Sequence, residues 1–336
     1  MRATGPISNR WKAFLLVLFA PFLAEFVTGS TAPQAWILPW VPLTFMAIYG
    51  VSAVLVREFA IRFRTGPAGV ILLGLAFGVI NEGMAAHSLF NPAWPGVGVL
   101  ASYGRLGGVS WLWAEWIVPF HAVYSISFPV FLSREFWPEV RDTRFLTDRG
   151  AVLLAPVPVV VSIGTSFLVG AYPLSLVDWV GMFAFVALMV FLAWRWGRWF
   201  GSVPPAARWV PSPAAAATVG VLFFVVGQVG TWDTPDLGPY PVVGMVVLLG
   251  FYLLVAVFAR NLGPTAAGER ARFAFVLGGI GFYVALSPFS EFLLGRFALF
   301  PIDVVVFAAL VWLYRRRTAV AAPRIPPGAF GLAPAA

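Results

Sequence analysis

The sequence contains no cysteine and only one lysine, and both scarcities limit its chemistry. Without cysteine the chain has no disulfides, no thiolate metal sites and no cysteine nucleophile. Lys12 is the only lysine among 22 basic residues, so no intramembrane lysine is available for a Schiff base and a retinal protein is excluded. The preference for arginine over lysine indicates a prokaryotic host with a GC-rich genome.

Charged residues of either sign are scarce. They make up 11% of the 336 residues, against roughly a quarter in ordinary soluble proteins. Apolar residues make up 60%, and the mean hydropathy is +0.87, so most of the surface must face lipid. The net charge of +8 does not indicate nucleic-acid binding, because membrane proteins collect positive charge on their cytoplasmic loops.

Long apolar runs recur along the whole chain. A membrane-spanning helix needs about 20 mainly apolar residues, and these runs are continuous rather than alternating, which favours helices over a β-barrel. The sequence therefore predicts an all-α polytopic membrane bundle, with residues 1–315 as a single transmembrane domain. The ten expected spans are 12–30, 37–57, 67–87, 110–132, 150–170, 176–195, 213–230, 240–259, 272–292 and 297–314.

The placement of the arginines predicts the orientation. When ten helices are threaded from a cytoplasmic N-terminus, both termini lie in the cytoplasm, and only Arg105 and Arg296 of the 22 basic residues lie outside. We therefore expect a multi-pass protein of the plasma membrane. The basic, proline- and alanine-rich segment 316–336 is expected to be a disordered cytoplasmic tail that contacts anionic lipid headgroups.

The acidic residues divide into two groups by depth. The inner group lies among arginines, where we expect ordinary surface pairing that contributes little to stability. The inner group comprises Glu58, Glu135, Glu139, Asp142, Asp148 and Glu269. The outer group lies in the outer halves of helices or in outer loops, as do both histidines, His87 and His121. The outer group comprises Glu25, Glu82, Glu115, Asp178, Asp233, Asp236, Glu291 and Asp303.

Some of these outer residues lie inside apolar runs. They are Glu25, Glu82, Glu115, His121 and Asp303. Placing an ionisable group at mid-helix costs about 2.5–3.5 kcal/mol on insertion scales, so such residues usually pair with one another or line a watery cavity. This predicts a polar site towards the outer side. The alternative is that the residues reach the interface from helix ends or only lock helices together.

The third span and the loop after it form the most distinctive stretch. Asn81 and Glu82 lie near the outer membrane edge, and His87 follows Glu82 by five residues, about 140° around a helix, so the two share a face poorly unless the helix ends between them. The pair Asn91-Pro92 and the glycines after it predict an ordered re-entrant or capping loop. Four tryptophans fit an interfacial aromatic belt. They are Trp94, Trp111, Trp113 and Trp116.

The last helices echo the first four. "VILLGLAFGVINEGMAAHSLF" resembles "AFVLGGIGFYVALSPFSEFLL", and "IVPFHAV" resembles "LFPIDVV". This predicts a parallel repeat of residues 12–132 and 213–314 around a two-helix insert at 150–195. Transporters commonly place a site at the interface of such repeats. The corresponding residues are His121 and Asp303, Arg105 and Arg296, and His87 and Glu291.

The run from "EFVTGST" through "LVREFAIRF", "GLAFGVINEG", "SLFNPAWP" and "YGRLGGVSWLWA" to "FHAVYSISFP" resembles a group of bacterial and archaeal multi-pass hypothetical membrane proteins. This resemblance implies the membrane fold and no particular activity. A fainter similarity is to CAAX-protease-like intramembrane endopeptidases, whose water-activating site uses a Glu-Glu pair and a Phe-x-x-x-His motif. Asn81-Glu82 stands at the place of the first motif, and His121 is preceded at four positions by Ile117 rather than by phenylalanine.

Three functional interpretations remain open, and the first is a carrier with an outer-facing polar cavity for a small molecule or ion. Its buried carboxylates and histidine would serve as proton or cation sites, and its outer arginines would attract an anionic group. The expected binding residues are Glu25, Asn81, Glu82, Glu115, His121, Arg105, Glu291, Arg296 and Asp303. We expect no cofactor, no resident metal and no nucleic-acid partner.

The second interpretation is an intramembrane hydrolase or protease. In it Glu82 is the general base, and His121, with Glu115 or His87, polarises a carbonyl or holds a metal. The third is a structural or sensory membrane protein in which the charged residues only secure helix packing.

Overall fold

The computed structural model describes residues 6–168, 172–201, 209–263, 265–294 and 300–320. These residues form helices and one short hairpin, in which β1 (Arg105–Leu106) pairs antiparallel with β2 (Val109–Ser110). Within the described residues, eight helices are long and apolar enough to cross a membrane. The prediction of an all-α polytopic membrane bundle is therefore confirmed.

Helices in the first part of the chain change type along their length, because an α-helix passes into a π-helical segment whose wider turn holds an extra residue. Three of these segments follow a proline, at Pro21, Pro42 or Pro119. Proline lacks an N–H and leaves a carbonyl one turn earlier unpaired, which favours a change of helical register. In chain order, with η1, η3, η4 and η6 π-helical, the elements are α1 (Pro6–Pro21), η1 (Phe22–Phe26), η2 (Pro33–Ile37), α2 (Trp40–Phe45), η3 (Met46–Gly50), α3 (Val51–Phe63), α4 (Gly66–Val79), η4 (Ile80–Ala85), η5 (Gly98–Ala101), α5 (Trp111–Phe120), η6 (His121–Ser127), α6 (Phe128–Phe136) and η7 (Pro138–Val140).

The remaining described elements contain no π-helical segment. Two of these helices begin at a side-chain cap, because Thr147 accepts a hydrogen bond from the Gly150 N–H and Ser212 from the Ala215 N–H, at 3.1 Å in both cases. The elements are α7 (Asp148–Leu154), α8 (Val157–Leu168), α9 (Leu176–Gly201), α10 (Pro213–Asp233), η9 (Thr234–Leu237), α11 (Pro241–Arg260), α12 (Ala266–Leu294) and α13 (Phe300–Val320).

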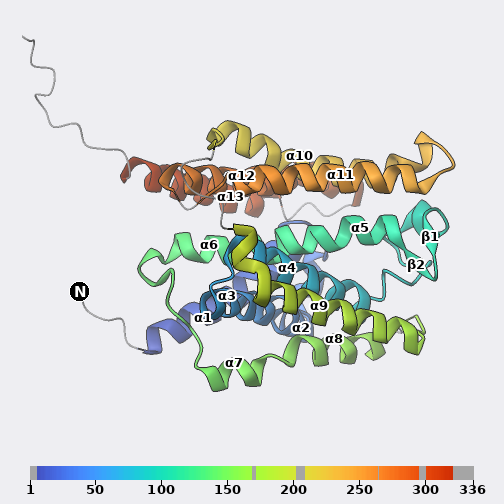
Figure 1. Cartoon of the computed structure of the whole chain (residues 1–336), viewed down its shortest axis with the longest axis horizontal. Coiled ribbons are helices and arrows are strands. Elements are labelled where there is room, and N and C mark those ends of the chain that lie inside the picture. Colours follow the sequence, from blue (N-terminus) through green and yellow to red (C-terminus); the bar gives the residue numbers. More distant parts are fainter. Residues whose placement is uncertain (1–5, 169–171, 202–208, 264, 295–299, 321–336) are drawn as a thin grey trace, which may run out of the picture.

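The helices lie in layers, as Figure 1 shows. Helices α10 to α13 form one layer, α4 to α6 lie beneath it, and α1, α2, α7 and α8 lie furthest from it. Aromatic rings join the first two layers, with Tyr124 packed edge-on against Tyr283 and Phe224 at centroid distances of 4.9 and 5.4 Å. The β1–β2 hairpin and the α10–α11 connection mark one end of the bundle, which we call the hairpin end (Figure 1).

Glycines in α4 bring this helix close to α5 and η6. A Cβ on Gly78 would lie 2.8 Å from the carbonyl oxygen of Val118, and one on Gly74 would lie 2.7 Å from the Cα of Ala122. Small residues permit such close backbone approach in membrane helices. Because the two backbones nearly touch, short polar side chains on η4 and η6 can reach one another directly.

The expected spans 12–30 and 297–314 correspond to α1 with η1 and to α13, which are not among the eight long apolar helices. The number of ten spans, the orientation and the parallel repeat therefore stay predictions. Helix α13 continues to Val320, and the rest of the expected tail lies outside the described residues, as does Arg296.

Candidate functional site

Each of the four π-helical segments carries a buried polar residue, and these residues meet. Glu25 lies in η1, Tyr49 in η3, Asn81 and Glu82 in η4, and His121 in η6; each is less than a tenth exposed. Single π-helical turns occur frequently at functional sites. We call the hydrogen-bonded set around them the π cluster. It comprises Glu25, Thr31, Tyr49, Asn81, Glu82, Ser88, Trp113, His121 and Ser125.

A carboxylate and an imidazole form the centre of the π cluster. The Nε2 of His121 lies 2.7 Å from the Oε1 of Glu82, and its Nδ1 lies 2.9 Å from the hydroxyl of Ser125. Ser88 donates to the other oxygen of Glu82 and accepts a hydrogen bond of 3.0 Å from the indole N–H of Trp113. Every polar atom of the Glu82 and His121 side chains therefore has a partner inside the protein.

A second buried carboxylate lies beside this pair. The hydroxyl of Tyr49 donates to the Oε1 of Glu25, and that of Thr31 donates to Oε2 at 2.6 Å. The amide of Asn81 links the two parts, because its Nδ2 lies 2.9 Å from the Tyr49 hydroxyl and 3.0 Å from the Oε1 of Glu82. The contacts form a continuous series from Thr31 to Trp113.

No fixed positive charge from the described residues contacts the carboxylates of this site. Within the described part of the chain, no lysine or arginine forms an ion pair with Glu25 or Glu82, and His121 is the only partner that can become cationic. Aromatic rings enclose the imidazole, with Phe120 and Phe77 at centroid distances of 5.1 and 5.8 Å. A buried carboxylate in such surroundings depends on the hydrogen bonds that it accepts from neighbouring side chains.

Other candidate acids lie apart from the π cluster. Glu115 is half-buried on α5, and its Oε2 has no hydrogen-bond partner among the described residues. Asp303 is buried in the first turn of α13. The side chains of Glu291 and Arg296 lie outside the described part of the structure.

His87 also points away from Glu82. The helix ends at Ala85, and His87 takes a positive φ of 55°, which turns its side chain towards the segment before α9. Its Nδ1 donates to the carbonyl of Tyr172 at 2.7 Å, and its ring packs edge-on against Trp179.

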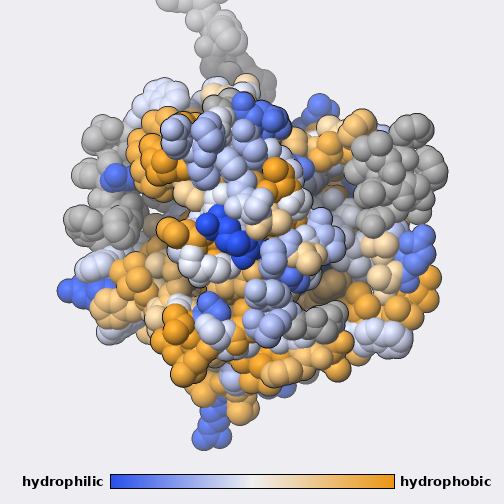
Figure 2. Space-filling view, turned by 90° about the vertical axis from the view of Figure 1, so that its right-hand side faces the viewer, coloured by the Kyte–Doolittle hydropathy of each residue, from blue (hydrophilic) through white to orange (hydrophobic). Residues whose placement is uncertain are grey.

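Arg105 orders the loop that leads to α5. Its guanidinium donates to the carbonyls of Ala101 at 2.8 Å, Phe90 at 2.7 Å and Gly108 at 2.5 Å. These bonds close the segment that the sequence predicts as a capping loop. Figure 2 views the hairpin end, where hydrophilic residues lie among apolar ones.

The prediction of an interfacial aromatic belt is wrong for two of its tryptophans. Trp113 and Trp116 are only 6% and 3% exposed. They lie on α5 between α4 and α10, so neighbouring helices cover both faces. Trp113 donates to Ser88 in the π cluster, and Trp116 packs edge-on against Phe224.

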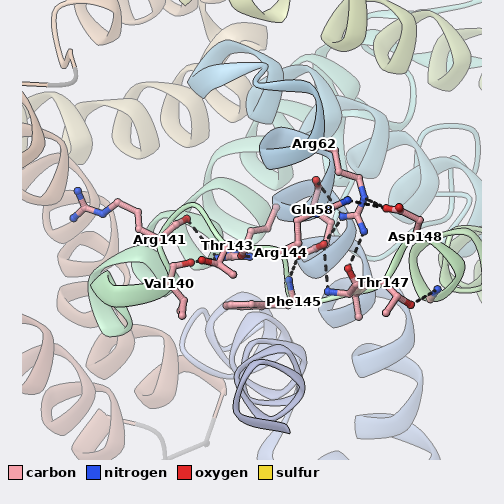
Figure 3. Close-up of polar contacts among 12 residues, drawn as sticks. Glu58, Arg62, Val140, Arg141, Thr143, Arg144, Phe145, Thr147 and Asp148 are labelled. Carbon is pink, nitrogen blue, oxygen red and sulfur yellow. Dashed lines mark hydrogen bonds and ion pairs between the residues drawn. The ribbon is translucent and has the colours of Figure 1, made fainter. Parts of the chain in front are cut away.

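A second buried polar group lies on α3, and Figure 3 shows it. Glu58 is 1% exposed and contacts Arg62, the Arg57 guanidinium at 3.3 Å, and the backbone N–H groups of Phe145 and Leu146 at 2.6 and 3.3 Å. We call Glu58, its two arginines and the loop 140–146 the arginine clamp.

The arginines of this clamp also bind the loop backbone. Arg57 donates to the carbonyls of Val140 at 2.8 Å and Thr143 at 3.0 Å, and its guanidinium lies 3.5 Å from the ring centre of Phe145. The expectation of surface pairing is wrong for Glu58, because the loop after α6 folds over it. It is also wrong for Glu135, which is buried beside Arg141 at 3.2 Å.

Several members of the π cluster were not among the candidates drawn from the sequence. They are Thr31, Tyr49, Ser88, Trp113 and Ser125. The spacing of Ser125, four residues after His121, could have indicated it, since such residues share a helix face. No group of three or more histidine and acidic side chains within the described residues could hold a metal ion.

A family model described as "Uncharacterized membrane protein family" matches residues 14–322 of the chain. The match includes every residue of the π cluster and of the arginine clamp. No curated protein matches the chain, and no solved structure matches it either.

Proposed function

We propose that this chain, which belongs to an uncharacterized membrane protein family, is a carrier that binds a proton at the Glu82–His121 pair. The observation that carries the proposal is the 2.7 Å contact between a buried carboxylate and a buried imidazole on two π-helical segments. Ionisable groups within membrane-spanning segments are costly and commonly belong to proton relays or ion pathways.

The hydrogen bonds of the pair suit two protonation states. With Glu82 ionised and His121 neutral, Nε2–H donates to Glu82 and the Ser125 hydroxyl donates to Nδ1. When one proton is added to His121, Nδ1–H donates to Ser125 instead, and the 2.7 Å contact remains. The added proton changes the net charge of the pair from negative to neutral, which lowers the cost of enclosing it in a membrane.

Infrared difference spectroscopy of the protein in lipid films, recorded over a pH titration, tests proton binding. We expect carboxyl and imidazole bands that titrate together, and we expect Glu82→Gln to abolish the coupled change. The control Glu115→Gln alters an acid outside the π cluster and should leave it intact. A titration in Glu82→Gln that matches the wild type would contradict the proposal.

Transport is tested with a trapped pH dye in proteoliposomes that are exposed to a panel of small ions and organic anions. We expect at least one solute to drive proton movement in the wild type, and that movement to be lost in Glu82→Gln and His121→Asn. Solute-driven proton movement of equal size in Glu82→Gln would overturn the carrier assignment.

The same contact favours a second candidate, an intramembrane hydrolase in which Glu82 removes a proton from water and His121 orients the carboxylate. We prefer the carrier because both oxygens of Glu82 already have protein partners, whereas a hydrolase needs a water and a substrate carbonyl beside them. Cleavage of transmembrane peptides by the wild type, lost in Glu82→Gln, would favour the hydrolase.

We also propose that the carrier lies in the plasma membrane of a prokaryote with a GC-rich genome, with both termini in the cytoplasm. The arginine distribution supports this orientation. The exposed Arg315 and Arg316 at the end of α13 are suited to anionic headgroups. Cysteine accessibility labelling of residues placed at either end tests the orientation, and the chain has no native cysteine that would interfere.

A further inference from the structure

The Asn81 side chain stands between the two buried carboxylates of the π cluster. Its Nδ2 lies 2.9 Å from the hydroxyl of Tyr49, which donates to Glu25, and 3.0 Å from the Oε1 of Glu82. It also lies 3.3 Å from the Nε2 of His121. Among the residues that the structure describes, the hydrogen bonds from Glu25 to the Glu82–His121 pair therefore pass through this one amide.

The hydrogen count fixes the orientation of the amide. Tyr49 uses its only hydrogen on Glu25, so its oxygen must accept from Asn81, and an ionised Glu82 can only accept. Both N–H groups of Asn81 are thereby used. The carbonyl of Asn81 cannot take this place, because it would face two other acceptors. Asn81 therefore has no hydrogen left to donate to His121, and the 3.3 Å distance between Nδ2 and Nε2 is not a hydrogen bond.

An amide nitrogen does not relay protons as a hydroxyl or an imidazole does. Its lone pair is delocalised into the carbonyl, so it has no basic site that accepts a proton from Tyr49 while it passes another to Glu82. We propose that Asn81 is an insulating gate between two proton sites, Glu25 with Tyr49 on one side and Glu82 with His121 on the other. This inference rests on the proposed function and adds how the site is regulated.

The two proton sites differ in access. Glu25 accepts from Thr31, which is partly exposed in the loop after η1, whereas the described partners of Glu82 are buried. Protons thus reach Glu25 first and pass Asn81 only when the amide leaves its position. The rings of Tyr49 and His121 already lie 5.9 Å apart, so water or a direct contact can bridge them once the amide is displaced.

The backbone offers a means to move the amide. Asn81 belongs to the π-helical η4, whose extra residue can be passed along the helix as the register returns to α. A shift of one residue rotates the following side chains by about 100°. Such a shift would withdraw Asn81 from Tyr49 and connect the two acids.

The test is proton uptake into proteoliposomes driven by an imposed membrane potential, with no solute added. Asn81→Ala leaves space for water, and we expect uptake to rise about 10-fold over the wild type, equivalent to a barrier ~1.4 kcal/mol lower. Asn81→Asp, of nearly the same size, replaces the amide by a carboxylate that relays protons, and it should raise uptake as well. The control Asn91→Ala removes a loop asparagine that accepts from the Ala93 N–H, and it should leave uptake unchanged.

A gate and a purely structural hydrogen bond predict different effects of Asn81→Ala on proton uptake. If Asn81 only supports the fold, Asn81→Ala lowers uptake or leaves it unchanged. The inference is overturned when both Asn81 variants show uptake at or below the wild-type level while the infrared titration of the Glu82–His121 pair persists. Adding Glu82→Gln to Asn81→Ala should return uptake to the wild-type level. The proposed function would instead be contradicted if the infrared titration were the same in Glu82→Gln as in the wild type.

Discussion

Two buried glutamates on neighbouring helices, Glu58 and Glu82, are satisfied in opposite ways. Glu58 contacts two arginines and two backbone N–H groups. Glu82 contacts an imidazole, a hydroxyl and an amide. Arginine stays protonated in proteins, whereas an imidazole gains or loses a proton near neutral pH. Fixed counter-charges suit the first glutamate to structure, and exchangeable partners suit the second to proton binding.

The two glutamates also differ in the helix type of their backbone, which is regular at Glu58 and π-helical at Glu82. Glu58 lies within the regular helix α3 and draws the loop after α6 onto it. Glu82 lies in a π-helical turn and faces three more such turns. A regular helix gives one stable register, while a π-helical turn offers a second register nearby. The comparison therefore sets a regular helix fixed by arginines against the π-helical site for which we proposed a change of register.

The largest effect is expected from Glu58→Gln. The substitution leaves Arg57 buried without its counter-charge, and breaking a buried ion pair in this way costs about 3–5 kcal/mol. Unfolding in detergent, followed by tryptophan fluorescence, measures the loss. Glu139→Gln, at a more exposed acid, serves as control. Unfolding of Glu58→Gln at the wild-type midpoint would mean that the arginine clamp is not a structural element.

The second effect tests whether helix packing sets the geometry of the π cluster. The added methyl of Gly78→Ala would meet the Val118 backbone and push α4 from α5, at a cost of about 1–3 kcal/mol. Because Glu82 follows on η4, the infrared bands of the Glu82–His121 pair should shift as well. Gly164→Ala on α8, where nothing lies within 4 Å of the new Cβ, should leave both readings unchanged. If Gly78→Ala is less stable but keeps the wild-type infrared bands, the packing of α4 against α5 does not set the geometry of the π cluster.

A smaller effect on stability is expected at the other glutamate. In Glu82→Gln the new oxygen can accept from His121 and Asn81, and the new amide can donate to Ser88, so the unfolding free energy should change by less than about 1 kcal/mol. Proton binding should nevertheless be lost. If Glu82→Gln unfolds as readily as Glu58→Gln, the two glutamates have the same structural role and the comparison fails.

Much of this architecture could be predicted from the sequence. Apolar runs of membrane length indicated the helices. The cost of placing ionisable groups in apolar runs singled out Glu25, Glu82 and His121 as members of a polar site. Glu115 and Asp303 satisfied the same argument and lie elsewhere, because the direction of a side chain around its helix depends on register. The π-helical turns change that register.

Two features depended on tertiary contacts that no local pattern reports. Tyr49 is one aromatic residue in an apolar run, and only the approach of η1 and η4 makes it the link between Glu25 and Asn81. Glu58 stands near a helix end beside arginines, as a surface residue would. Its burial results from the later segment 140–146, which returns to cover it.

The smallest effect concerns a third acid, Glu139. Like Glu58 it pairs with a basic side chain, but unlike Glu58 and Glu82 it is exposed. Lys12 donates to Glu139 at 2.6 Å, but the Glu139 side chain is 52% exposed. This hydrogen bond lowers the pKa of Glu139 below its ordinary value of 4.5. A depressed pKa means that the stabilisation is complete above 4.5 and is lost as the pH falls through the lowered value.

The wild type should therefore exceed Glu139→Gln in unfolding free energy by less than about 1 kcal/mol at neutral pH. The gap should close as the solution is acidified and as salt is added, because both weaken an exposed ion pair. Lys12→Gln should lower the unfolding free energy by the same amount as Glu139→Gln. The double variant should be no less stable than either single variant. A gap that widens on acidification would reverse the sign of the argument. A gap as large as that of Glu58→Gln would show that exposure does not separate a weak ion pair from the arginine clamp.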